Sequence, residues 1–385
     1  MTEQTAPAHI SLEIPPLYIP YTTALHPDYD TLNKEALAWL GAFGPLDKTQ
    51  ASLFTDYNLV ELGCLTLPMS ARGEGLQLTV QTGVLGGLFD ALVLEKEPVD
   101  QDLGLMADVI TRTLQVMDSP TPPQPTDGQP HDPPFLALWA DLAHRVRAHA
   151  EPLVFHRWID GHRTWWLGQL RQTAYTLSGS RPSLDEYAFL RIQSYGGPTI
   201  PPTLEFVREV DLSAQQVAVP ELRALNEAAM LVMGWDNDII SYAREYSLNE
   251  AWEADNNRRH PINLVYLVQR DHGCALPEAF EHAVRLRDHV MCLFVQLSER
   301  YLPTADHDVR TYVADLGGTI RGYVEAMLSP RTKRYRKTET TRPGQDPDTP
   351  TFAFTHSITS DEPEPCARQP LPFSSIAWWW HLLDT

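Results

Sequence analysis

Cysteine is scarce in this sequence, and the few cysteines are not spaced as metal ligands. The 385 residues include Cys64, Cys274, Cys292 and Cys366, each far from the next along the chain. Cysteine-based zinc sites need closely spaced pairs, and small secreted domains need dense disulfide frameworks. Neither is expected here, and we predict that the four thiols are core side chains.

Positive charge, long apolar runs and an export signal are also lacking. The 30 lysines and arginines, against 50 aspartates and glutamates, leave a formal net charge of −20, which argues against a nucleic-acid-binding surface. No stretch of about eighteen residues is continuously apolar, and the N-terminus lacks the basic and apolar regions of a signal peptide. We therefore expect a cytoplasmic protein with no membrane span.

Strand-like alternation and internal repeats are absent as well, whereas helical periodicity recurs along the chain. A chain of 385 residues can bury a large core. We predict an all-α body over 31–336, preceded by an extended arm (1–30) and followed by a proline-rich tail (337–385). Helices are expected from about residue 30 and over 48–55, 76–96, 101–117, 135–178, 184–194, 219–247, 261–271, 277–300 and 306–329.

Two proline-rich stretches are not expected to form helices. Residues 119–134 are predicted to be a loop, because proline removes backbone donors and fixes φ. Residues 336–370 are expected to be disordered or loosely ordered. The three adjacent tryptophans Trp378, Trp379 and Trp380 follow. Leaving them in water would be costly, so we predict that they dock on the body or on a partner.

One predicted helix carries three oxygen-bearing side chains on a single face. Asn237, Ser241 and Glu245 are spaced four and four, so on a helix they fall within roughly 80° of one another. An amide oxygen, a hydroxyl and a carboxylate suit Mg²⁺ better than zinc. The alternative is a solvated polar face. The apolar residues from Ala228 to Trp235 favour the metal site, because polar groups on a buried helix need partners.

Three further features flank this stretch. An apolar helix carries Asp90 and, five residues on, Glu95. A later helix carries Arg191 just before a break rich in glycine and proline. The last predicted helix is followed by Arg334 and Tyr335.

In this order, the features resemble the bacterial class I terpene synthases, over roughly residues 10–336. The family signature N-D-x-x-S-x-x-x-E is matched by Asn237, Asp238, Ser241 and Glu245. Arg244 stands where lysine is commoner in the family.

The spacing of the other features agrees with the family. Its diphosphate-sensing arginine lies 46 residues before the signature asparagine, which is the position of Arg191 here. Its linker and effector positions follow at the helix break and correspond to Ser194 and Tyr195. Its closing R-Y pair corresponds to Arg334 and Tyr335.

The resemblance implies a single-domain class I terpenoid synthase helical bundle around a central active-site cavity. The implied enzyme uses three Mg²⁺ ions to ionise a linear isoprenyl diphosphate, with farnesyl diphosphate as the first choice and geranylgeranyl diphosphate as the second. It cyclises the carbocation to a terpene hydrocarbon or alcohol and releases diphosphate. The resemblance leaves open whether the protein is a homodimer.

The resemblance also implies roles for the site residues. Asp90 would hold two ions, and Asn237, Ser241 and Glu245 the third. The diphosphate would be bound by Arg191, Arg244, Arg334 and Tyr335. A carbonyl near Tyr195, freed by the helix break, would face the nascent cation.

One departure from the family pattern affects the first metal motif. The family usually has two adjacent aspartates followed by a third acid, whereas Ala91 takes the second position here. On an α-helix, residues 91 and 95 share a face, whereas 90 and 95 are about 140° apart. We therefore expect Asp90 to be the main ligand, with Glu95 supporting it from outside the ligand set or paired to a base such as Arg191. A solvated helix end is the alternative for Glu95.

The rest of the pocket should be inert and aromatic, because a carbocation attacks nucleophiles and is stabilised by π faces. The candidates are Phe89, Trp235, Tyr323 and the tail tryptophans, although each of these could instead be an ordinary core residue. A tail that acts as a lid predicts more water-quenched alcohol products after deletion of residues 366–385.

Two other functions are compatible with part of this pattern. A chain-elongating prenyltransferase uses similar metal chemistry but would need two aspartate-rich motifs, and the second motif here is of the Asn, Ser, Glu type. A non-catalytic helical protein would explain an acid motif that has decayed at Ala91.

Overall fold

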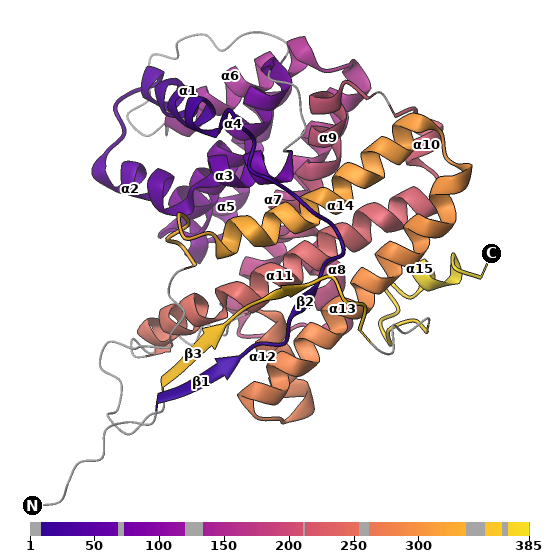
Figure 1. Cartoon of the computed structure of the whole chain (residues 1–385). Coiled ribbons are helices and arrows are strands. Elements are labelled where there is room, and N and C mark those ends of the chain that lie inside the picture. The colour runs from indigo at the N-terminus through magenta and orange to yellow at the C-terminus, as the bar shows by residue number, and fades with distance from the viewer. Residues whose placement is uncertain are drawn as a thin grey trace, which may run out of the picture.

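A computed structural model describes residues 9–67, 73–119, 134–210, 212–253, 262–335, 351–363 and 369–384, and most regular structure in these ranges is helical (Figure 1). The predicted all-α fold is confirmed. The α-helices are α1 (Tyr29–Ala42), α2 (Lys48–Tyr57), α3 (Leu59–Thr66), α4 (Glu74–Phe89), α5 (Leu103–Asp118), α6 (Pro134–His149), α7 (Pro152–Ser178), α8 (Leu184–Gln193), α9 (Ile200–Arg208), α10 (Ala214–Val217), α11 (Pro220–Glu253), α12 (Leu264–His272), α13 (Leu276–Tyr301), α14 (His307–Leu328) and α15 (Trp378–His381).

Shorter turns join some of these helices. The π-helix η1 (Asp90–Leu94) extends α4, and the 3₁₀ turns are η2 (Val99–Gln101), η3 (Gly197–Thr199) and η4 (Leu302–Thr304). Most of the predicted loop at 119–134 lies outside the described residues.

A reciprocal cap fixes the start of α8. The Ser183 Oγ accepts a hydrogen bond from the Glu186 backbone N–H (3.2 Å), and the Ser183 N–H donates to Glu186 Oε2 (2.9 Å). This pairing satisfies donors that a helix start otherwise leaves free. Arg191 therefore falls in the last turn of α8, where it is buried.

Two glycines of α7 let the end of α8 approach closely. A Cβ added at Gly161 would lie 2.4 Å from the Pro198 carbonyl oxygen, and one at Gly168 would lie 2.8 Å from the Gln193 carbonyl carbon. Only glycine tolerates such an approach. The end of α8 and η3 are therefore pressed against α7, which fixes the path of the chain at the helix break.

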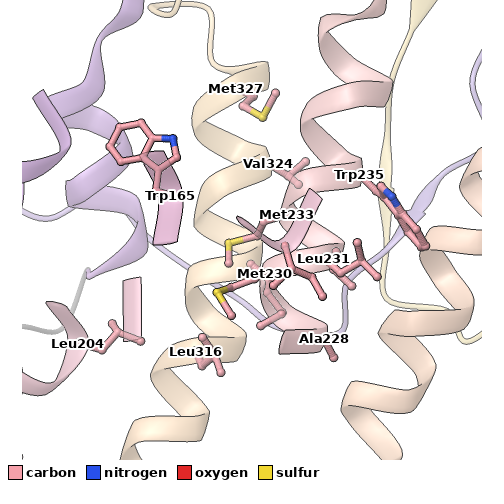
Figure 2. Close-up of a cluster of buried hydrophobic side chains, with 14 of the residues drawn as sticks. Trp165, Leu204, Ala228, Met230, Leu231, Met233, Trp235, Leu316, Val324 and Met327 are labelled. Carbon is pink, nitrogen blue, oxygen red and sulfur yellow. The ribbon is translucent and has the colours of Figure 1, made fainter. Parts of the chain in front are cut away.

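The central helix α11 packs against α8, α13 and α14. Figure 2 shows Met230 and Met233 of α11 on the side that faces α14, near Leu316 and Val324, whereas Trp235 points away from them. All five side chains are buried. Their burial sets the rotation of α11 about its axis, and with it the direction of the polar residues that follow.

A buried ion-pair network also holds α11. Arg287 of α13 donates to both carboxylate oxygens of Asp236 (2.7 and 3.0 Å), to Asp288 Oδ1 (2.9 Å) and to the Tyr18 carbonyl (2.5 Å). The side chains of Arg287 and Asp236 are 0% exposed. Because Asp236 directly precedes Asn237, the network anchors α11 beside the candidate metal ligands.

Removal of this buried cation should be strongly destabilising. Arg287→Met leaves the Asp236 carboxylate buried without its partner, so we expect a loss of about 3 to 5 kcal/mol in the free energy of unfolding, measured with urea. Arg285→Met is the control on the same helix, because its pair with Glu281 is exposed (3.6 Å) and should contribute less than about 1 kcal/mol. Similar losses in the two variants would contradict this account.

Two short strand pairs join the arm to the tail, a feature that the sequence analysis did not predict. β1 (His9–Glu13) pairs in parallel with β3 (Thr351–Thr355), and β2 (Leu17–Tyr18) pairs in parallel with β4 (Ile358–Thr359). Residues 351–363 are therefore ordered, contrary to the expectation for 336–370. Residues 336–350 and 364–368 lie outside the described part of the chain.

Aromatic packing fastens the strands to the helices. Phe354 of β3 is buried, with its ring centroid 5.8 Å from that of Tyr242 in α11 and 5.0 Å from that of Phe280 in α13. The predicted arm is thus extended and packed on the body, but through a sheet partner that lies more than 300 residues away in sequence.

The last two tail tryptophans dock on the body, as predicted. Trp379 and Trp380 are 0% and 2% exposed. Trp379 Nε1 donates to Glu227 Oε2 of α11 (3.0 Å), and the Trp380 ring centroid lies 5.3 Å from that of His289 in α13. The described tail residues, 369–384, do not line the central cavity, so they do not act as the lid considered from the sequence.

Removal of residues 369–385 should therefore affect stability and leave the products unchanged. Two buried tryptophans and their apolar neighbours account for an expected loss of more than about 3 kcal/mol in the free energy of unfolding. Trp378→Ala is the milder comparison, because Trp378 is only partly buried. An altered product profile in a folded truncated protein would contradict the assignment of the tail as a structural element.

The cysteine expectation needs correction. Cys292 is disulfide-bonded, so the four cysteines are not all core thiols. Cys64 and Cys274 are free, and Cys64 is buried. Cys366 lies outside the described residues.

Within the described residues, one helical segment, Glu74–Leu94, is long and apolar enough to cross a membrane by length and composition. Its mean hydropathy reaches 1.3, but 61% of its most apolar window is buried inside the protein. A core helix accounts for both observations.

Candidate active site

A cavity of about 670 Å³ lies among α3, α4, α7, α8, α11 and α14. It brings together side chains from widely separated parts of the chain. The predicted site residues that line it are Asp90, Glu95, Arg191, Ser194, Tyr195, Asn237, Ser241, Arg244, Glu245, Tyr323, Arg334 and Tyr335.

The polar face of α11 forms one wall, as its spacing predicted. Ser241 Oγ donates a short hydrogen bond to Glu245 Oε1, and Asn263 Nδ2 donates to Glu245 Oε2 (3.0 Å). Asn237 accepts a hydrogen bond from Arg191 Nη2 at its Oδ1 (2.8 Å). The three candidate ligands are thus held by neighbouring side chains within the cavity wall.

The Arg191 guanidinium is fixed from several directions. Its Nε donates to the Gly234 carbonyl (3.1 Å), and its Nη2 lies 2.9 Å from Asp238 Oδ1. A Cβ at position 234 would lie 2.9 Å from Arg191 Cγ, so glycine provides the space for this side chain. Arg191 is 6% exposed, and its position places its charge at the cavity without freedom to swing away.

Two residues beside this guanidinium, Asp238 and Tyr187, were not predicted to have a role in the site. The Tyr187 hydroxyl donates to Asp238 Oδ2 (2.5 Å), and the Leu264 N–H donates to the same oxygen (3.0 Å). Burial raises the pKa of Asp238 to about 7, although the Arg191 charge opposes the rise. Asp238 is therefore a buried anchor for Arg191 on the side of α11 beside the ligand face.

The opposite wall departs from regular α-helix where the acid motif begins. In η1, the Glu95 N–H donates to the Asp90 carbonyl (2.8 Å), a bond between residues five apart. A π-helical turn therefore separates these residues, and the expected 140° offset of an α-helix is wrong here. π-Helical turns of this kind occur often at functional sites.

The two carboxyl groups influence each other across this turn. Burial raises the pKa of Asp90 well above its usual value, and the charge of Glu95 raises it further. Gln169 Nε2 of α7 donates to Asp90 Oδ1 (2.6 Å). Desolvation also raises the pKa of Glu95, and the Arg244 charge opposes the rise. The Glu95 side chain is nevertheless 44% exposed, as expected if it lies at a solvated helix end, and its carboxylate lies 3.8 Å from Arg334 Nη2. The base that pairs with it is thus Arg334, whereas Arg191 was the expected example.

Arg334 and Tyr335 line the cavity between the α11 ligand face and the acid motif at η1. The Arg334 guanidinium lies 3.9 Å from the ring centroid of Tyr57, and its backbone N–H donates to the Asp56 carbonyl (2.9 Å). Its buried Nε makes no hydrogen bond within the described part of the chain. Asn237 Nδ2 donates to the Tyr335 hydroxyl (3.2 Å). Tyr57 holds Arg334 in place and was missed by the sequence analysis.

The break after α8 turns Tyr195 toward the cavity. Gly196 adopts φ = +91°, which favours glycine, and a Cβ at Gly197 would lie 2.5 Å from the Tyr195 ring. The Arg191 guanidinium lies 5.4 Å from the Tyr195 ring centroid, and the Tyr323 ring packs edge-on at 6.2 Å. The ring is thus clamped between a cation and a second aromatic side chain.

Two predicted pocket residues do not line the cavity. Phe89 packs in the core against Phe135, Trp139 and Trp166, with ring centroids 6.0, 5.8 and 5.4 Å away. Trp235 is buried on the other side of α11 (Figure 2). The cavity instead receives Trp165 of α7, which was not among the predicted pocket residues, and of those candidates Tyr323 lines it.

The oxygen ligands around the cavity suit a hard divalent cation. Asp90 is partly buried and Glu95 is exposed, and the two carboxyl groups repel each other across the turn, a repulsion that a bound cation would relieve. The facing wall offers an amide oxygen, a hydroxyl and one carboxylate. Within the described residues, no group of three or more His, Cys, Asp or Glu side chains is arranged as a metal site, as expected when asparagine and serine supply two of the ligands.

Restoring the missing acid at position 91 tests how much this wall depends on it. Ala91 lines the cavity and is partly exposed, so Ala91→Asp has room and adds one hard oxygen ligand. We expect kcat/KM to stay within about threefold of the parent or to rise. A fall of more than about tenfold in a folded variant would show that the site cannot accept the extra carboxylate.

Comparison with known proteins finds a matching family model and several relatives. Residues 83–292, more than half of the chain, match the family model described as terpene synthase family 2, C-terminal metal binding. Bonnadiene synthase of Allokutzneria albata is 28% identical over 381 residues, which cover 96% of this chain and 98% of the relative. Diterpene cyclase DtcycA of a Streptomyces species is 27% identical over 379 residues, covering 97% and 98%.

The fold also has solved counterparts. The crystal structure of the SVS_A2 protein from ancestral sequence reconstruction superposes with a TM-score of 0.76 at 25% identity, covering 96% of this chain and 98% of that chain.

Proposed function

Because this chain belongs to the bacterial terpene synthase family, we propose that it is a Mg²⁺-dependent cyclase that ionises farnesyl diphosphate and closes the resulting cation to a terpene. The observation that carries the proposal is the meeting of three elements in one cavity: the α11 ligand face, the acid pair of η1 and three arginines. Divalent metal use agrees with the metal-binding family.

Ionisation needs stabilisation of the negative charge that develops on the leaving diphosphate. Bound Mg²⁺ ions, three by the family resemblance, would supply that stabilisation as Lewis acids. The residues that would hold them are Asp90, Glu95, Asn237, Ser241 and Glu245.

The arginines supply the rest of the positive charge that stabilises the leaving diphosphate. Arg191 and Arg334 are held by neighbouring side chains before any substrate binds, so little reorganisation is needed when they donate to the diphosphate. Tyr335 and Arg244 are further hydrogen-bond donors to the diphosphate. Ser194 Oγ and the Tyr195 hydroxyl are buried without hydrogen-bond partners in the described part of the chain, beside the site where the allylic bond would break.

Farnesyl diphosphate is the first choice of substrate, as the family resemblance implies. The cavity of about 670 Å³ lies within the range of about 300 to 1,000 Å³ that is typical of small-molecule sites. The second candidate, geranylgeranyl diphosphate, is favoured by the relative named as a diterpene cyclase.

The testing experiment is incubation with C10, C15, C20 and C25 diphosphates and Mg²⁺, with products identified by gas chromatography and mass spectrometry. We expect a cyclic product from the C15 substrate, whereas a cyclic product from the C20 substrate alone would favour geranylgeranyl diphosphate. Longer linear chains on addition of isopentenyl diphosphate would favour a chain-elongating enzyme. No turnover of any substrate would favour a non-catalytic protein. A homodimer, which the resemblance leaves open, is part of this proposal only as a possibility to be measured by the mass of the protein in solution.

A further inference from the structure

A fully buried amide joins the start of α12 to the ligand face of α11. Asn263 directly precedes α12 and is 0% exposed. Its backbone is extended (φ −144°, ψ 143°), as is usual for a residue that caps a helix. A side chain without exposed surface does not touch a ligand, so any effect of Asn263 on the site acts through the residues that it contacts.

The hydrogen bonds of Asn263 fix the orientation of its amide. The Val265 N–H donates to Asn263 Oδ1 (2.9 Å), so the amide oxygen faces α12. Asn263 Nδ2 donates to the Asp238 carbonyl (2.9 Å) and to Glu245 Oε2 (3.0 Å). A carbonyl and an ionised carboxylate only accept, and a flipped amide would place its oxygen against both of them. The NH₂ group therefore faces α11.

Further hydrogen bonds hold the chain on either side of Asn263. The Leu264 N–H donates to Asp238 Oδ2 (3.0 Å). The Tyr187 hydroxyl donates to the same oxygen (2.5 Å) and lies 3.3 Å from the Ile262 carbonyl oxygen. The backbone at Asn263 is thus tied to α11 and α8 through both of its neighbours, and its amide is a fixed point in the structure.

The two carboxylate oxygens of Glu245 have different partners. Oε2 accepts from Asn263 Nδ2, and Oε1 accepts from the Ser241 hydroxyl. From this arrangement we propose that Asn263 is a positioning residue of the metal site, which holds Oε2 and leaves Oε1, beside Ser241, to bind a divalent cation. The inference rests on the proposed Mg²⁺-dependent function. Partners that orient a metal ligand in this way typically contribute about 10- to 100-fold in metal affinity.

The physical reason is the freedom of a long side chain. An unrestrained glutamate samples many rotamers, and fixing one of them when the cation binds opposes binding. Asn263 fixes Glu245 before any cation arrives. The contribution is therefore to cation affinity and not to the chemical step, so saturating cation should restore most of the turnover that a variant loses.

Asn263 also caps α12, so the test must separate the cap from the contact with Glu245. Asn263→Ser keeps a side-chain oxygen for the Val265 N–H, because serine caps a helix as well as asparagine does. Its shorter side chain lacks the donor that reaches Glu245. Asn263→Ala loses both the cap and the donor. Asn263→Thr is the second capping variant, in case the serine variant fails to fold.

Cation binding is measured directly, with Mn²⁺ as the probe and inorganic diphosphate present, from the electron paramagnetic resonance signal of free Mn²⁺. The second measurement is the Mg²⁺ dependence of diphosphate release. The third is the urea midpoint of unfolding. Asp306→Ser is the matched control, because Asp306 is an exposed residue that caps α14.

We expect Asn263→Ser and Asn263→Ala to weaken the binding of at least one Mn²⁺ ion about tenfold or more. The Mg²⁺ concentration for half-maximal diphosphate release should rise by a similar factor, and release at saturating Mg²⁺ should return to within about threefold of the parent. The serine variant should have the higher urea midpoint of the two, because it keeps the cap. Asp306→Ser should bind Mn²⁺ as the parent does.

Two results would overturn the proposal. Binding of Mn²⁺ by Asn263→Ser that equals that of the parent would leave Asn263 as a helix cap alone. A loss of diphosphate release that saturating Mg²⁺ does not restore, in a folded variant, would place its effect outside cation binding. Failure of the parent itself to bind Mn²⁺ with diphosphate would instead refute the proposed metal site on which the inference depends.

Discussion

Glu245→Gln should lower kcat/KM by about 10³-fold or more, equivalent to at least about 4 kcal/mol of transition-state stabilisation. Glu245 is the one carboxylate of the α11 ligand face, and it contacts Ser241 and Asn263 directly. The substitution keeps the size of the side chain and removes its charge, so a hard cation loses its strongest ligand on this wall.

The measurement is Mg²⁺-dependent diphosphate release across a range of metal concentrations. Glu281→Gln is the matched control, because Glu281 lies exposed on α13 in a surface pair with Arg285, and it should leave kcat/KM within about twofold. Full activity of Glu245→Gln at ordinary metal concentration would remove the α11 face from the mechanism.

Arg191→Met should have a comparable effect on turnover, with a loss of about 10³-fold in kcat/KM. It removes the donor proposed to sense the diphosphate and leaves the Asp238 carboxylate buried without its cation. We also expect a loss of about 3 to 5 kcal/mol in the free energy of unfolding. Arg191→Lys keeps the charge without the planar fork and should be less active than the parent by about 10²-fold.

Stability and catalysis must be separated in this test. Asp238→Asn combined with Arg191→Met removes both buried charges, so it should recover stability without recovering turnover. Arg163→Met is the exposed control on α7, where Arg163 pairs with Asp160 at the surface. Turnover by the double variant close to that of the parent would show that Arg191 serves the fold and not the diphosphate.

The features that could be predicted from sequence depend on local periodicity. Asn237, Ser241 and Glu245 share a helix face because they are spaced four apart, and the structure places all three on one wall. Ser183 and Glu186 are three residues apart, which is likewise a local pattern typical of a helix start, and α8 begins at this pair. Both patterns can be recognised without knowledge of neighbouring elements. The roles of Asn237, Ser241 and Glu245 as metal ligands stay predictions.

The same periodicity separates Trp235 from the ligand face. Trp235 lies two residues before Asn237, so on a helix it points about 200° away from the ligand face. Its exclusion from the cavity was therefore available from the sequence. Trp165 lies one turn from Gln169 on α7, but that relation becomes informative only once Gln169 is known to contact Asp90.

Other features depend on contacts that no local pattern encodes. The π-helical turn between Asp90 and Glu95 changes their relative direction, and α-helical periodicity does not predict such a turn. The pairing of β1 with β3 joins segments more than 300 residues apart. Neither strand shows an alternation long enough to predict a partner.

The most direct test of the central claim is diphosphate release from farnesyl diphosphate, measured with Mg²⁺ and again after chelation. The account predicts release with Mg²⁺, together with a cyclic hydrocarbon or alcohol, and a loss of release when the metal is removed. Release that persists without divalent metal, or no release from any C10 to C25 substrate with it, would contradict the account.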